Sequence, residues 1–204
     1  LNIPMSRGAG DAEYRAAFDN RLLPKLRDYR PEFLVISAGF DALAALRPGG
    51  RVLAYHDRSD GGLFVTLCEM AFAGRAGVII DADALCATDD ELAAALFAEE
   101  LGAVIQVRET DAGTVLEALA ARGLAARAVA RVDQADRIRV RRGAAVLYDE
   151  SRTALHRAWS ETTWQIQSLR DNPESARQEY DRILDVGDPG LSPVVTFDPA
   201  AGIA

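Results

Sequence analysis

The segment best equipped for chemistry is a polar loop, residues 56–62, with the sequence HDRSDGG. It falls between an expected strand over 52–55 and an apolar helix expected over 63–72, whose first N–H groups are unpaired and attract anions. Asp57 offers the hard oxygen that Mg²⁺ prefers, the Ser59 hydroxyl can bond a phosphate oxygen, and the two glycines allow close backbone approach. The loop therefore predicts a magnesium–nucleotide contact.

A structural role is open for the same loop. Ser59 or Asp60 could cap the helix, and Gly61 and Gly62 could form a tight turn. Residue types alone leave both interpretations standing.

Strands and helices alternate around this loop. Strands are expected over 52–55, 78–80, 103–107 and 127–132, helices over 63–72, 91–100 and 113–122, and a hairpin over 138–148 that turns at Gly143. Two further helices follow over 151–169 and 173–184, the first capped by Ser151. The pattern predicts an α/β (α+β) domain with a mixed sheet over 47–150 and a helical extension with a tail over 151–204.

The first 46 residues form a separate unit in this interpretation. Apolar residues recur at helical spacing over 11–29, and the apolar run 33–38 suits one short strand. The turn residues 47–50 then mark the boundary. We expect a helix–strand fragment over 1–46, with its first 45 residues poorly packed because a lone strand leaves unpaired edges.

Composition narrows the class of protein. The 204 residues are 49% hydrophobic and 26% charged, which is typical of a globular protein. A formal charge of −8 excludes a nonspecific nucleic-acid binder, and no apolar run has the roughly 18 residues of a membrane span. Without a signal segment the expected location is cytoplasmic. Cys68 and Cys86 lack zinc spacing and are expected to be structural.

Four segments in order resemble the formylglycinamide ribonucleotide amidotransferases, the phosphoribosylformylglycinamidine synthase family. They are AYHDRSDGGLFVTLCEMAFAG (54–74), FAEELGAVIQV (97–107), ESRTALHRAWSETTWQIQSLRDNPESARQEYD (150–181) and DPGL (188–191). The resemblance covers about 52–204 and implies an aminoimidazole-ribonucleotide-synthetase-like carboxy-terminal domain. It also implies an ATP-dependent ligase of de novo purine biosynthesis, which makes formylglycinamidine ribonucleotide from formylglycinamide ribonucleotide, glutamine and ATP.

The family motif implies roles for two residues of the loop. Asp57 would be a Mg²⁺ ligand and Ser59 a contact to ATP or ADP, in an auxiliary nucleotide site formed by two homologous halves. The other synthetase half and the glutaminase domain expected after the DPGL segment are missing, so they would be partners supplied in trans. We therefore expect a ligase fragment that is inactive alone.

Two alternatives remain. The chain could be a noncatalytic docking domain that uses its helices over 151–184, with Arg152 facing a glutaminase domain. It could also be the remnant of a zinc deacetylase, because NIPMSRGAGDAEYRAAFDNRLLPKLRDYRPEFLVISAGFDA (2–42) resembles the histone-deacetylase-like amidohydrolases. Asp41 stands at the zinc-ligand position of that family, but the histidine ligands expected upstream are missing. The joining of two families suggests a chimeric chain or an assembly artefact.

Other polar and aromatic residues have structural interpretations. Glu99 and Glu100 are expected to be solvated charges at a helix end, because adjacent helical residues point about 100° apart. His156, Trp159 and Trp164 are expected to pack against the domain.

Overall fold

The computed structural model describes residues 31–36, 46 and 49–187, and the helical prediction over 11–29, Asp41 and the DPGL segment lie outside them. Seven strands form one mixed sheet in the order β2-β4-β1-β5-β3-β6-β7, in which only the β3–β6 pair is parallel. The strands are β1 (Pro31–Ile36), β2 (Ala54–Asp57), β3 (Gly77–Asp81), β4 (Ala103–Arg108), β5 (Ala126–Asp133), β6 (Arg137–Arg142) and β7 (Ala145–Ser151).

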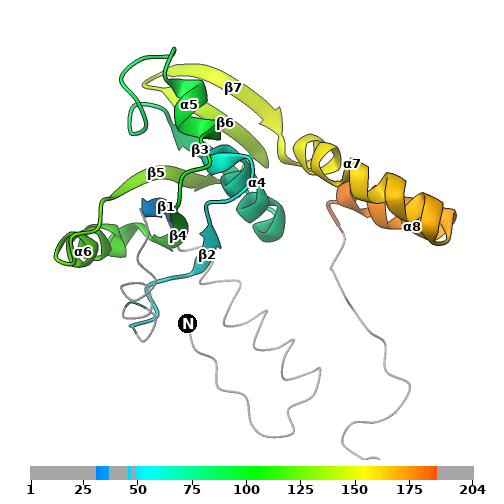
Figure 1. Ribbon diagram of the computed structural model, residues 1–204, viewed down its shortest axis with the longest axis horizontal. Coiled ribbons are helices and arrows are strands. Elements are labelled where there is room, and N and C mark those ends of the chain that lie inside the picture. The colour runs from blue at the N-terminus through cyan, green and yellow to red at the C-terminus, as the bar shows by residue number, and fades with distance from the viewer. Residues whose placement is uncertain (1–30, 37–45, 47–48, 188–204) are drawn as a thin grey trace, which may run out of the picture.

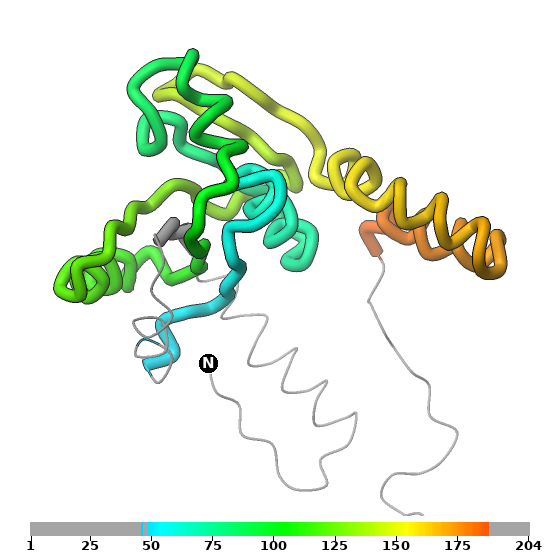
Figure 2. Tube along the Cα trace, in the orientation of Figure 1, coloured from blue at the N-terminus to red at the C-terminus, as the bar shows by residue number. Residues whose placement is uncertain are grey.

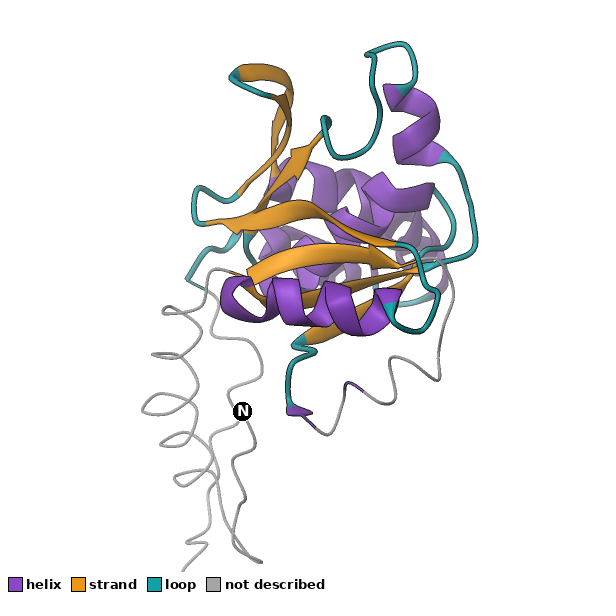
Figure 3. Ribbon diagram, turned by 90° about the vertical axis from the view of Figure 1, so that its left-hand side faces the viewer, coloured by secondary structure: helices purple, strands orange, loops and turns teal. Residues whose placement is uncertain are grey.

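Helices lie on both faces of the sheet and beyond its end (Figure 1 and Figure 3). They are α4 (Gly62–Gly74), α5 (Leu92–Phe97), α6 (Glu109–Ala120), α7 (Arg152–Arg170), α8 (Pro173–Asp181) and a 3₁₀ turn, η3 (Arg182–Leu184). The predicted α/β class with a mixed sheet and a helical extension is confirmed for the described residues. None of the helices described is long and apolar enough to cross a membrane.

Strand β4 shows why the sheet has a core on each face. Val104 contributes to a cluster built on Leu63, Leu67 and other residues of α4, whereas Ile105 and Val107 contribute to a second cluster with α6. Successive side chains of a strand point to opposite faces, and a strand buried on both faces is continuously apolar. Apart from Gln106, β4 (AVIQVR) is apolar on both faces up to Val107, so α4 and α6 each cover one face of its part of the sheet.

Strand β1 lies inside this sheet instead of at an edge. It pairs antiparallel with β4, where Pro31 faces Arg108, and with β5, where Ile36 faces Ala126. The expected unpaired edges are therefore wrong for this strand. Backbone pairing joins β1 to strands on the other side of the 46/47 boundary. The division of the chain at that boundary therefore stays a proposal that concerns the sequence resemblance only.

Helix α8 ends at Asp181 instead of at 184, with a 3₁₀ turn after it, and two other helix boundaries differ from the prediction by three residues or more. α5 ends at Phe97 instead of at 100, and α6 begins at Glu109 instead of at 113. Gly113 lies exposed within α6, so the glycine does not mark the start of this helix. The hairpin turn at Gly143, with φ +54°, and the Ser151 cap of α7, which accepts from the Ala154 N–H at 2.9 Å, are confirmed.

The helical extension packs on itself and on α4. Trp164 of α7 stacks on Tyr180 of α8 with ring centroids 4.7 Å apart, and Arg157 lies 3.8 Å over the Tyr180 ring. His156 stacks on Phe72 of α4 at 4.6 Å. The packing roles expected for these aromatic residues are confirmed, although Trp159 remains 55% exposed.

Candidate nucleotide and magnesium site

The predicted loop connects β2 directly to α4, as the tube in Figure 2 shows. Asp57 is the last residue of β2, and the helix begins at Gly62 after the cap residue Gly61. No side chain caps α4, and the Gly62 N–H instead donates to the backbone oxygen of Ser59 at 2.9 Å. The capping role considered for Ser59 and Asp60 is therefore wrong, which leaves their side chains for other partners.

Arg58 anchors the loop to the segment that follows α5. Its side chain is 9% exposed, and its Nη2 donates to the Ala98 oxygen at 2.8 Å. Its Nη1 pairs with Glu100 at 3.2 Å, while its backbone N–H donates to the Gly102 oxygen at 2.8 Å. A guanidinium suits such a role because its planar donors can satisfy several acceptors at once. The loop is thus fixed from within by a buried cation.

The two glycines meet a conformational and a steric demand. Gly61 and Gly62 have φ angles of +79° and +68°, in the left-handed region that glycine tolerates. A Cβ on Gly62 would lie 2.7 Å from the backbone carbon of Phe97 and 2.9 Å from the Ala98 oxygen. The backbone that approaches Gly62 is that of α5 and of the residue after it, whereas close approach of an anion to the two glycines stays a prediction.

Glu99 and Glu100 are exposed, as expected for solvated charges, but the prediction that they end a helix is wrong, and both contact the loop. They follow α5 instead of ending it, and Glu99 accepts a hydrogen bond from the Gly61 N–H at 3.0 Å. A carboxylate at this point lies at the positive end of α4. The two acids lie far along the sequence from Arg58, Gly61 and Gly62. No local sequence pattern could therefore have revealed that these residues meet.

The prediction placed Asp57 and Ser59 on one loop, but β2 extends over Ala54–Asp57, so Asp57 ends the strand and Ser59 lies two residues further along, in the connection to α4. The Asp57 carboxylate is 66% exposed, and His56 Nδ1 lies 3.5 Å from its Oδ1. An exposed carboxylate at a strand end can donate one oxygen to Mg²⁺, which usually retains several waters and takes only one or two protein carboxylates. The described residues hold no cluster of three metal-ligating side chains. The magnesium role of Asp57 stays a prediction.

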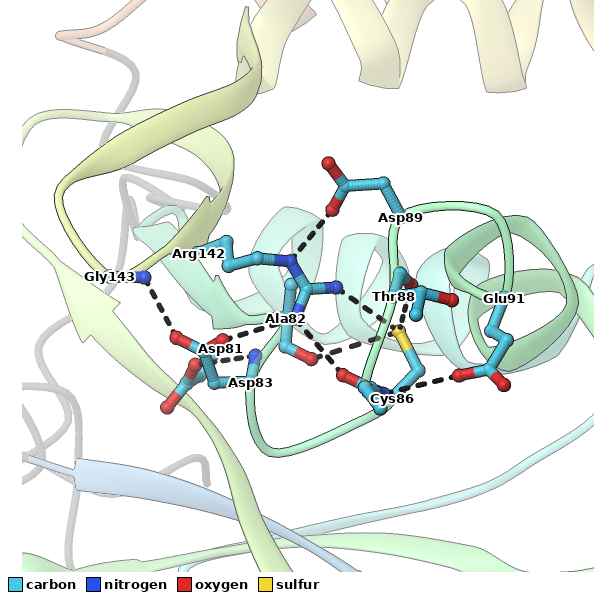
Figure 4. Close-up of polar contacts among 10 residues, drawn as sticks. Asp81, Ala82, Asp83, Cys86, Thr88, Asp89, Glu91, Arg142 and Gly143 are labelled. Carbon is cyan, nitrogen blue, oxygen red and sulfur yellow. Dashed lines mark hydrogen bonds and ion pairs between the residues drawn. The ribbon is translucent and has the colours of Figure 1, made fainter.

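A second acidic loop, residues 81–91, is occupied by internal contacts (Figure 4). Arg142 pairs with Asp83 at 3.0 Å and with Asp89 at 2.7 Å, and it donates to the Cys86 carbonyl at 3.0 Å. The other Asp83 oxygen accepts from the Gly143 N–H at 2.8 Å. These carboxylates are neutralised by Arg142 and the hairpin turn, so the loop has a structural explanation.

The two cysteines differ in their surroundings. Cys68 is buried in α4, where desolvation and then the charge of Glu69 raise the pKa of its thiol to about 12. Cys86 is half-buried, and its sulfur lies 3.2 Å from the Thr88 oxygen and 3.5 Å from Arg142 Nη2. Cys68 is a packing residue, as predicted, whereas Cys86 belongs to the polar loop around Arg142.

We expect an aromatic disulfide reagent to modify Cys86 in the native protein and Cys68 only after unfolding. A buried thiol with a raised pKa supplies almost no thiolate at neutral pH, so its reaction should be slower by about a hundredfold or more. Absorbance of the released thiolate measures both rates. Cys86→Ser should abolish the native reaction, and a native rate unchanged in that variant would contradict the assignment.

Arg152 does not face outward as a docking residue would. It is 6% exposed and forms a close ion pair with Asp136, and its backbone N–H donates to the Asp136 oxygen at 3.1 Å. The docking role expected for its side chain is therefore wrong. Nearby, burial lowers the pKa of His156, and Arg152 and Arg75 lower it further, so the ring favours its neutral form.

Comparisons with known proteins agree with this geometry. The family described as AIR synthase related protein, C-terminal domain, matches residues 20–143. PurL of Thermotoga maritima complexed with ATP is 18% identical, with a TM-score of 0.57, and the match covers 62% of this chain and 26% of that chain. Phosphoribosylformylglycinamidine synthase II of Thermotoga maritima gives the same four values. PurL complexed with AMPPCP is 14% identical, with a TM-score of 0.54, covering 78% and 33%.

The mixed sheet with helices on both faces is thus the fold of a synthase carboxy-terminal domain. The chain belongs to the AIR synthase related protein family, of which it carries the C-terminal domain. It spans about a quarter to a third of the length of the structures described above. The family match begins at residue 20 and includes β1, so the resemblance of residues 2–42 to deacetylases finds no support.

Proposed function

We propose that the chain supplies one side of a magnesium–adenine nucleotide site in a phosphoribosylformylglycinamidine synthase, with Asp57 as a metal ligand and Ser59 as a nucleotide contact. The observation that carries this proposal is the loop itself. It leaves the Asp57 carboxylate exposed beside the N-terminus of α4, while Arg58 and the glycines fix its backbone.

The solved relatives support the choice of ligand. PurL of Thermotoga maritima has been crystallised with ATP, with ADP and with FGAR. The partial metal site in this chain suits a ligand that brings its own phosphate oxygens, because Mg²⁺ commonly bridges one or two carboxylates and substrate phosphates. The complete ligase reaction would also need the other synthetase half and a glutaminase domain, because these 204 residues span only about a quarter to a third of the solved relatives. We expect no ligase activity from this chain alone.

Calorimetry with ADP and Mg²⁺ tests the proposal. We expect weak binding by the wild type, which requires Mg²⁺, and a loss of affinity of about tenfold or more in Asp57→Ala, because the variant removes a charged metal ligand. Ser59→Ala should lose about tenfold, corresponding to about 1.5 kcal/mol for one hydrogen bond to a charged group.

Asp60→Ala is the matched control, since it removes the same charge from the same loop at an exposed position. Its affinity should stay within about twofold of the wild type, because screened surface charges contribute little. An equal loss of affinity in Asp57→Ala and Asp60→Ala would mean that both carboxylates act only through their charge, and that Asp57 is not a specific metal ligand. Absence of any heat with the wild type would overturn the proposal.

A docking function for the helical extension is the second candidate. On α7, Leu169 is 90% exposed and Ile166 and Trp159 are 55% exposed. Such apolar side chains on one helix favour contact with another protein surface. Co-purification of a glutaminase domain with the wild type, lost in Leu169→Glu with Ile166→Glu, would support it; retained binding in that variant would remove it.

A further inference from the structure

A chain of polar contacts connects the extension helix α7 to the Asp57 loop. Trp159 of α7 donates its Nε1–H to Glu69 Oε1 at 3.0 Å. The other carboxylate oxygen of Glu69, Oε2, lies 3.1 Å from His56 Nε2. His56 Nδ1 in turn lies 2.7 Å from the backbone oxygen of Asp57. The four residues come from α7, α4 and β2, so the contacts cross three elements.

Glu69 is unusual for its position. It is the one charged residue of α4 (GLFVTLCEMAFAG), and its side chain is three-quarters buried. A carboxylate taken largely out of water is costly unless its oxygens are hydrogen-bonded or paired. Each Glu69 oxygen has one such partner, Trp159 on α7 for Oε1 and His56 on β2 for Oε2.

We propose that Glu69 and Trp159 are positioning residues for Asp57, so that docking of α7 on α4 sets the geometry of the magnesium loop. Trp159 orients the Glu69 carboxylate, and Glu69 fixes the position of the His56 ring, which packs against the Asp57 peptide at the end of β2. Only the expected effect on nucleotide affinity rests on the proposed function. The chain of contacts from Trp159 to Asp57 is present without ligand.

The two tryptophans of α7 provide a matched pair of variants. Trp159→Phe removes an indole N–H that has an acceptor and keeps a ring against Phe72, whose centroid lies 6.1 Å away. Trp164→Phe removes an indole N–H that is buried and has no partner, and keeps a ring against Tyr180. Both changes have the same size on the same helix, but only the first breaks the chain of contacts.

Hydrogen exchange on the full chain without ligand decides the proposal. We expect Trp159→Phe to speed exchange of the amides in residues 54–62 by about threefold to tenfold, as loss of a hydrogen bond to a charged group allows. Trp164→Phe should leave those amides unchanged. Unchanged exchange over 54–62 in Trp159→Phe, or an equal increase in both variants, would overturn it.

Calorimetry separates this inference from the proposed function. If the wild type binds Mg–ADP, Trp159→Phe and Glu69→Gln should each weaken binding about threefold to tenfold, and Trp164→Phe should not. Wild-type affinity in the first two variants would overturn the positioning role while leaving the nucleotide site intact. If the wild type binds nothing, the nucleotide proposal fails and hydrogen exchange alone decides the link.

Discussion

Gly62→Ala should lower the free energy of unfolding by about 3 kcal/mol, because two costs act at one residue. The φ of +68° disfavours any residue with a Cβ, and that Cβ would lie within 3 Å of three backbone atoms at the exit of α5. Backbone atoms cannot rotate away as a flexible side chain can. The chain must therefore separate α5 from the start of α4, or distort the loop.

Denaturant unfolding of Gly62→Ala measures this loss, with Gly113→Ala as the matched control. Gly113 is exposed within α6, where nothing lies within 4 Å of an added Cβ, so alanine should stabilise the protein by about 0.5–1 kcal/mol. We therefore expect the same change, glycine to alanine, to lower the free energy of unfolding at position 62 and to raise it at position 113. If Gly62→Ala were as stable as the wild type, the close contact with α5 would be absent in solution.

Arg152→Met should cost about 2 kcal/mol, because it leaves the Asp136 carboxylate without its partner in a half-buried site. Asp136 is 38% exposed, which moderates the loss through solvent screening. It also has a φ of +51°, an uncommon conformation that the Arg152 ion pair and backbone hydrogen bond hold in place. The contact joins the turn between β5 and β6, which contains Asp136, to the first residue of α7.

A double-mutant cycle with Asp136→Asn identifies the pair as the cause. The double variant should lose clearly less than the sum of the single losses in urea unfolding, whereas strict additivity would speak against a direct interaction. Arg170→Met provides the surface comparison, since Arg170 pairs with Asp171 but is 67% exposed. Its effect should stay within about 0.5 kcal/mol.

The sequence was most informative where one element carries a complete local pattern. β4 is mostly apolar, the hairpin turns at a glycine, and α7 begins with a serine cap, so each could be predicted before pairing was known. The position of the Asp57 loop between strand and helix was predictable for the same reason. Its binding role stays a prediction.

Features made by distant residues escaped local reasoning. The pairing of β1 with β4 and β5 depends on strand order, which hydrophobic periodicity does not encode. Glu99 was interpreted as a helix-end charge from its neighbours in the sequence. Its hydrogen bond from the Gly61 N–H joins residues 38 positions apart, which local reasoning does not detect. Glu69 gave one weak signal, a single charge in an apolar helix, but its partners lie on two other elements.

The central place of β1 also has a kinetic consequence. A strand encoded near residue 31 must find partners encoded after residues 102 and 125, so the middle of the sheet cannot close until two long loops have closed. Such nonlocal pairing raises contact order and slows folding. During synthesis, β1 would leave the ribosome well before either partner, which makes this early strand the one most in need of protection from mispairing with other chains.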